Sequence, residues 1–96
     1  MLGGNQYVEN GTTNDTLIQE GNQIVVGEDG LANRTVIENG AQTVADGAVA
    51  DMPIVNNGVQ YVENDGVATN TTINSGGWQH IAGGTAVSAT IKTGAV

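Results

Sequence analysis

Residues 58–73 read GVQYVENDGVATNTTI and contain one complete copy of a motif that recurs along the whole chain. In this copy, glycine is followed by glutamine and valine at alternate positions, and a second glycine is followed by alanine, threonine and isoleucine. Consecutive motif glutamines are separated by 17, 19, 18 and 19 residues. They are Gln6, Gln23, Gln42, Gln60 and Gln79. Five copies at nearly constant spacing indicate a repeat architecture.

The remaining motif positions can be aligned on these glutamines. A second glycine follows each of them after five to seven residues, and we assign it as Gly11, Gly30, Gly47, Gly66 and Gly84. An isoleucine comes seven residues beyond each of these glycines: Ile18, Ile37, Ile54, Ile73 and Ile91. The length varies mainly between the valine and the second glycine, where a surface loop can absorb it.

The periodicity within each copy is that of β-strands. Glutamine and valine, like threonine and isoleucine, are two residues apart, which places each pair on one face of an extended strand. Two glycines per copy and the many β-branched residues disfavour helices. Each copy therefore predicts two clear short strands, with a third near the alanine, and corners at the glycines.

A unit of about 18 residues cannot bury an apolar face alone, but stacked copies form a continuous core. We therefore predict an all-β fold, a right-handed parallel β-helix or β-solenoid of about five turns of 17–19 residues. One inward column is expected to consist of Val8, Val25, Val44, Val62 and Ile81. The second is expected to consist of Ile18, Ile37, Ile54, Ile73 and Ile91. Pro53 has no N–H, so we expect it to remove one ladder hydrogen bond and to bulge the third turn.

The charge balance restricts the partners. Ten acidic residues against two basic ones give a formal net charge of −8, which disfavours nucleic acid and anionic lipid surfaces. No run of about 18 apolar residues is present, so we expect no membrane insertion of this segment. The acidic residues are spread over the copies without a fixed partner for acid–base chemistry, so we expect no enzyme activity and no catalytic residues.

We also expect neither a metal site nor a cofactor. The chain has no cysteine, and His80 is its one histidine, without a second histidine at ligand spacing. The most promising contact surface is the outward column between glutamine and valine: Tyr7, Ile24, Thr43, Tyr61 and His80. Such an exposed column can bind a partner, but a row of ordinary outward-facing β-formers that pack on their neighbours is the more common case.

Residues 76–86, GGWQHIAGGTA, and residues 66–73, GVATNTTI, resemble the AIDA-type repeat in the passenger domains of self-associating autotransporter adhesins. The resemblance extends over essentially all 96 residues. It implies that residues 1–96 are a single β-solenoid segment of a longer passenger, extracellular on the bacterial surface or secreted. The implied function is self-association in autoaggregation and biofilms, or adherence to a host receptor.

The same resemblance implies a glycosyltransferase as a partner, because some such passengers carry heptose on serine or threonine. The hydroxyl candidates are Thr12, Thr69, Ser75 and Ser88. An acceptor segment for a protein O-heptosyltransferase is therefore an alternative function, and a structural solenoid of a phage or filament is another. A polysaccharide-acting β-helix enzyme is a further alternative. An ice-binding solenoid is disfavoured, because the motif has T-x-I where such a solenoid has T-x-T.

Overall fold

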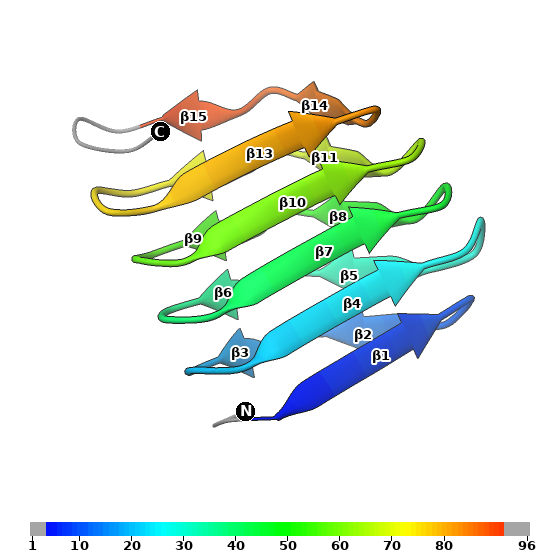
Figure 1. Ribbon diagram of the computed structural model, residues 1–96, viewed down its shortest axis with the longest axis horizontal. Helices are drawn as coiled ribbons and strands as arrows, with labels where there is room; N and C mark the ends of the chain where they lie inside the picture. Colours follow the sequence, from blue (N-terminus) through cyan, green and yellow to red (C-terminus); the bar gives the residue numbers. More distant parts are fainter. Residues whose placement is uncertain (1–3, 92–96) are drawn as a thin grey trace.

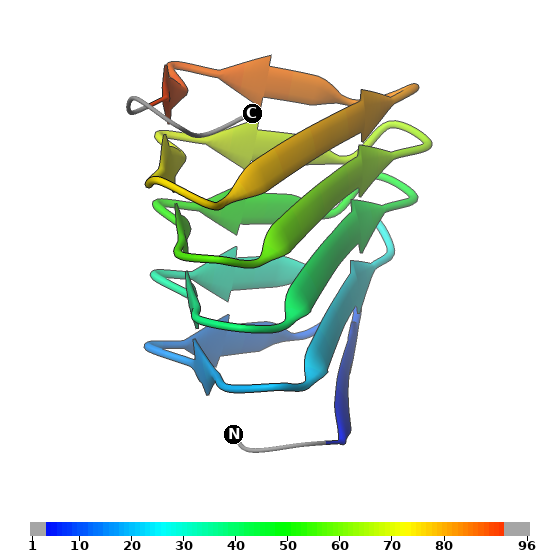
Figure 2. The same cartoon turned by 60° about the vertical axis from the view of Figure 1, so that its left-hand side comes forward.

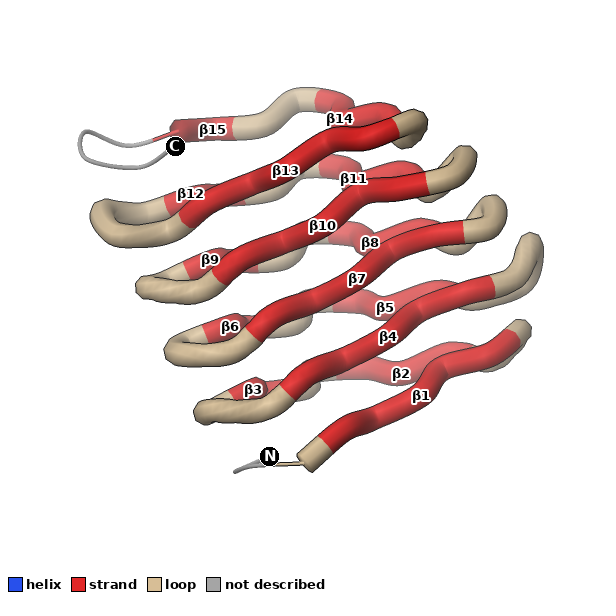
Figure 3. The backbone as a smooth tube through the Cα atoms, in the orientation of Figure 1, coloured by secondary structure: helices blue, strands red, loops and turns tan. Residues whose placement is uncertain are grey.

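Each motif copy folds into one turn of a stack of parallel strands, in a computed structural model that describes residues 4–91. In Figure 1 the chain crosses the front of the stack to the right, returns to the left behind, and rises with each turn. This winding is right-handed. Figure 2 shows the three strands of a turn on different sides of the stack. In Figure 3 strands and loops recur at the same places in successive turns.

The strands form three parallel five-stranded sheets, one strand of each turn per sheet. Sheet 1 consists of β1 (Asn5–Glu9), β4 (Asn22–Val26), β7 (Ala41–Ala45), β10 (Val59–Glu63) and β13 (Trp78–Ala82). Sheet 2 consists of β2 (Thr12–Asn14), β5 (Leu31–Asn33), β8 (Val49–Asp51), β11 (Val67–Thr69) and β14 (Thr85–Val87). Sheet 3 consists of β3 (Leu17–Ile18), β6 (Val36–Ile37), β9 (Ile54–Val55), β12 (Thr72–Ile73) and β15 (Thr90–Ile91). The prediction of an all-β parallel solenoid of about five turns is confirmed.

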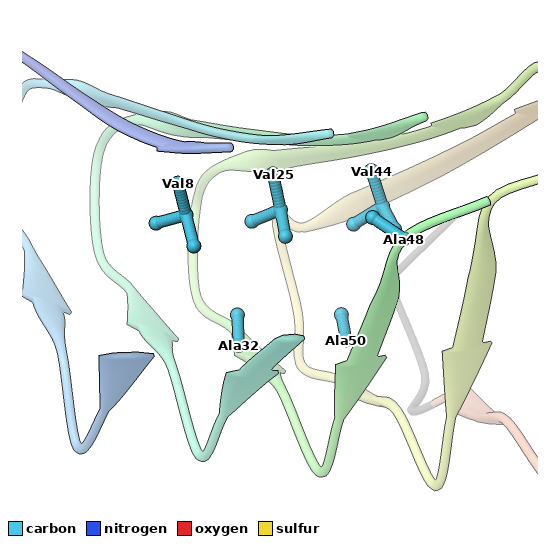
Figure 4. Packing of buried hydrophobic residues seen from close by; sticks show 6 residues of the cluster. All are labelled: Val8, Val25, Ala32, Val44, Ala48 and Ala50. Carbon is cyan, nitrogen blue, oxygen red and sulfur yellow. The ribbon is translucent and has the colours of Figure 1, made fainter. Parts of the chain in front are cut away.

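The core consists of small and β-branched side chains from facing sheets. Val25, Val44 and Val62 are fully buried in sheet 1, and Val8 is 7% exposed. Figure 4 shows Val8, Val25 and Val44 pointing toward the alanines of sheet 2. Ile81 lies in register with Val62 but is 41% exposed, because β13 is the last strand of sheet 1 and no described strand covers it.

The predicted isoleucine column is wrong in the third turn. Val55, and not Ile54, pairs with Ile37 and with Ile73, and it is fully buried. Ile54 points outward and is 37% exposed. The backbone of Ile91 pairs with Ile73, whereas its side chain lies outside the described residues.

The error in the third turn comes from the glycine assignment. Leu31 N–H donates to Gly11, Val49 N–H to Gly30, and Val67 N–H to Ala48, so Ala48, and not Gly47, occupies the second glycine position. Counted from Ala48, the buried aliphatic residue again comes seven residues later, at Val55.

The expected effect of Pro53 is also wrong. The ladder continues on both sides of it, because Met52 N–H donates to Thr69 and Ile54 N–H donates to Thr35. The carbonyl of Pro53 in turn accepts from Thr72 N–H. The third turn therefore needs no bulge to accommodate the proline.

Two of the three corners in each turn differ in how they are built. Between sheets 2 and 3, each turn has a non-glycine residue in the left-handed region, with φ from 53° to 58°: Asp15, Arg34, Met52, Asn70 and Ser88. Between sheets 3 and 1, glycine is required by close approach of neighbouring turns. A Cβ on Gly40 would collide with the carbonyl oxygen of Gly21 and lie 2.7 Å from Ile18 Cγ2.

Candidate functional site

The outer face of sheet 1 carries several side-chain columns, and two of them contribute to the candidate site. The first, here called the contact column, is the predicted set Tyr7, Ile24, Thr43, Tyr61 and His80, which the parallel register aligns. The second, here called the tryptophan column, consists of Asn5, Asn22, Ala41, Val59 and Trp78. Both columns face solvent because glutamine and valine occupy the inward positions of the same strands.

The inward glutamines hold these strands in register. Gln42 Nε2 donates to Gln23 Oε1 at 2.7 Å, and Gln60 Nε2 donates to Gln42 Oε1 at 2.8 Å. The ladder continues at both ends: Gln23 Nε2 donates to Gln6 Oε1, and Gln79 Nε2 donates to Gln60 Oε1, each at 2.8 Å. The three middle glutamines are fully buried, so their amides need these partners.

Sequence reasoning did not identify this glutamine ladder. The signal was present, since a period of two puts each glutamine on the same face as its inward valine. A buried amide at every turn is satisfied only when identical turns stack above and below, which the stacked fold provides.

Neighbouring turns form a hollow on the outer face at the β13 end of sheet 1. Val59 and Tyr61 of β10 and Trp78 and His80 of β13 line this aromatic hollow, whose volume is about 460 Å³. The rings of Tyr61 and His80 meet edge to face, with centroids 5.8 Å apart and planes at 70°. Trp78 is 53% exposed and Tyr61 37% exposed. The structure thus brings two of the five contact-column residues together in a concave site.

No described lysine or arginine lines this hollow. Arg34 lies at the corner between sheets 2 and 3, where its Nε donates to Asp15 Oδ1 at 2.6 Å. This hydrogen bond, with the attraction between the two charges, lowers the pKa of Asp15 and raises that of Arg34. Both side chains are exposed, so solvent screens the pair.

The described residues contain no group of three or more His, Cys, Asp or Glu side chains that could hold a metal ion. Within residues 4–91, no helix is long and apolar enough to span a membrane.

The predicted hydroxyl positions are spread over the surface. Thr12 is exposed at the start of β2, and Thr69 is half-buried at the end of β11. Ser75 is exposed in the turn before β13, and Ser88 is exposed at a left-handed corner with a φ of 57°. The structure does not gather these four residues into one site.

The fold and this outer face define a β-solenoid segment with side chains displayed in regular columns. No family model matches the chain, and no curated protein matches it. Among solved structures, it is similar to a fragment of TibA covering residues 55–350, hyper-glycosylated by TibC. The sequences are 36% identical and the TM-score is 0.89, over 95% of this chain and 35% of the TibA fragment. This chain thus spans about a third of that fragment, and the likeness supports a passenger-type β-solenoid.

Proposed function

We propose that this chain is an adhesive, non-enzymatic β-solenoid segment of a bacterial surface autotransporter passenger. It would promote self-association or adherence to host cells from an extracellular position, as part of a longer protein. The observation that carries the proposal is the similarity to the hyper-glycosylated TibA fragment, at 36% identity over 95% of this chain. The resemblance of the sequence motif to the AIDA-type repeat supports the same class of protein.

The geometry suits contact by many weak interactions. Each turn repeats the outward positions of the turn below, so a partner that runs along the stack meets a side chain at an equivalent position in every turn. Weak contacts repeated on one rigid body gain affinity through multivalency. The net charge of −8 opposes contact between copies, so screening by salt should strengthen self-association.

Beads coated with the chain test this proposal. We expect coated beads to cluster with one another, more at high than at low ionic strength, or to be retained on a layer of epithelial cells. Beads coated with Val55→Asp, whose core is disrupted, should do neither. Coated beads that stay dispersed at every salt concentration and do not bind cells would contradict an adhesive function.

A second candidate is an acceptor for a protein glycosyltransferase. It is favoured by the similar solved structure, which is hyper-glycosylated by TibC. Ser88 is exposed at a left-handed corner between sheets 2 and 3. Thr12 and Ser75 are exposed as well.

Co-expression with TibC and measurement of the intact mass test this second candidate. Increments of one sugar each would support it, and peptide mapping would show which of the four hydroxyls is modified. Ser88→Ala should remove one increment if that corner is used. An unmodified mass in the presence of active TibC would contradict acceptor function for that enzyme.

A further inference from the structure

All aromatic side chains of the chain lie on one face, and none is in the core. The chain has two tyrosines, one tryptophan and no phenylalanine, and all three belong to the outward columns of sheet 1. Tyr7 is 70% exposed, Trp78 53% and Tyr61 37%. Aromatic residues usually contribute most when their large area is buried. Their placement here is better explained by contact with another molecule.

Tyr61, Trp78 and His80 form the walls of the aromatic hollow in fixed relative positions. Parallel pairing sets Tyr61 beside His80 and Val59 beside Trp78. The edge-to-face contact of Tyr61 with His80 orients the two rings at 70°. The volume of about 460 Å³ falls in the range of small-molecule sites.

The lining offers apolar ring faces with polar atoms at their edges. A phenol hydroxyl, an indole N–H and an imidazole can donate or accept hydrogen bonds beside those faces. A pyranose ring has the matching character, since its C–H groups form an apolar face and its hydroxyls project from the rim. We propose that the aromatic hollow binds a pyranose ring of a neutral saccharide.

Charge selects among saccharides. No described lysine or arginine lines the hollow, and the chain carries a net charge of −8, which repels sialylated, sulfated or phosphorylated ligands. A quaternary ammonium ion is the main rival, because it binds aromatic faces and is attracted by negative charge. The residues that line the hollow include no carboxylate to pair with such a cation.

The chain offers its own reporters for a test. Trp78 is the one tryptophan and His80 the one histidine, so their NMR signals need no assignment. Lactose titrated into the ¹⁵N-labelled chain should shift the indole N–H of Trp78 and the imidazole signals of His80 saturably. For a ligand of this size on an open site, we expect a Kd on the order of 1 mM.

Two tyrosines of the same column provide a matched pair. Tyr61→Ala removes one wall and should weaken lactose binding about tenfold. Tyr7 lies in the contact column three turns away from Tyr61, so Tyr7→Ala should leave the affinity for lactose unchanged. Circular dichroism confirms that each variant is folded. If Tyr61→Ala does not fold, Trp78→Val takes its place. This substitution introduces the residue type found at the paired position Val59 in the turn below, and the His80 signals then report lactose binding.

Three results would overturn the inference. One is the absence of a saturable shift with either of two neutral disaccharides, lactose and cellobiose. Another is equal affinity in Tyr61→Ala and Tyr7→Ala. The third is a stronger response to tetramethylammonium chloride or to sialyllactose than to lactose. The inference is independent of the proposed function, because bead clustering tests association while this titration tests one soluble ligand.

Discussion

The second and third turns follow the same backbone path but have different residues at some equivalent positions. At four matching positions the second turn has Gly30, Ala32, Thr35 and Ile37, and the third has Ala48, Ala50, Pro53 and Val55. One of these positions has alanine in both turns, two others keep a small or aliphatic group, and the backbone ladder is unaffected. The remaining position has proline in place of threonine and so lacks the hydroxyl. The comparison teaches that the stack selects side chains by size and polarity at each place.

The two turns differ most in how they satisfy the buried amides. In the second turn, Gln23 Oε1 accepts from both Gln42 Nε2 and Thr35 Oγ1. In the third turn, Gln42 Oε1 accepts from Gln60 Nε2, and Pro53 has no hydroxyl to add. Buried polar groups are expensive when unpaired, so this difference should be measurable.

The largest expected effect tests the register of the third turn. Val55→Asp places a carboxylate in the core between Ile37 and Ile73, at a cost of about 4 kcal/mol or more. That is comparable with the whole stability of a small domain, so we expect unfolding. Ile54→Asp changes an outward residue and should cost about 1 kcal/mol or less. Thermal unfolding followed by circular dichroism distinguishes the two. Equal losses, or the reverse order, would show that Ile54 is the inward residue.

The next effect compares the two glutamines. Gln42→Leu leaves Gln60 Nε2 buried without its acceptor and should cost about 2–4 kcal/mol. Gln23→Leu removes the acceptor of both Gln42 Nε2 and Thr35 Oγ1, so it should cost about 1 kcal/mol more. Denaturant unfolding measures both, with Thr43→Ala on the outer face as the control. A smaller loss for Gln23→Leu would mean that the hydroxyl of Thr35 adds nothing.

A smaller effect, with opposite signs, is expected for two threonines. Thr35 and Thr71 are both buried, but Thr35 donates to Gln23 Oε1, whereas Thr71 Oγ1 has no hydrogen-bond partner. Thr35→Val should therefore destabilise the chain by about 1 kcal/mol. Thr71→Val replaces an unpaired hydroxyl with a methyl group of similar shape and should stabilise it by about 1 kcal/mol. Destabilisation by both substitutions would show that Thr71 has a partner in solution.

Much of the fold could be predicted from the residues of the repeated motif, but the residue assignment of the third turn and the aromatic hollow could not. The alternation of glutamine with valine predicts strands, and the repeated glycines predict two of the three corners of each turn, whereas the corner between sheets 2 and 3 has no glycine. The sequence misassigns the third turn because Gly47 and Ala48 are adjacent and glycine is the usual corner residue. Only the stacking of Ala48 on Gly30 decides between them. The alignment of the motif copies predicts that Tyr61 and His80 share a column, and the structure confirms this register. The hollow also depends on how these rings pack with Val59 and Trp78, which the motif spacing does not determine.

The smallest effect concerns the corner where the second turn has Arg34 and the third has Met52. Asp15→Asn removes the ion pair with Arg34 while keeping a residue that tolerates the left-handed conformation, here with a φ of 55°. The pKa of Asp15 is lowered in the folded chain, so the pair stabilises the fold above the ordinary aspartate pKa of about 3.9. This contribution is lost as the pH falls through the lowered pKa. The stability difference between the chain and Asp15→Asn should thus be present at neutral pH, small because the pair is exposed, and absent in strong acid or high salt. A difference that persists unchanged into strong acid would mean that the side-chain amide disturbs the corner itself, and that the charge of Asp15 contributes nothing there.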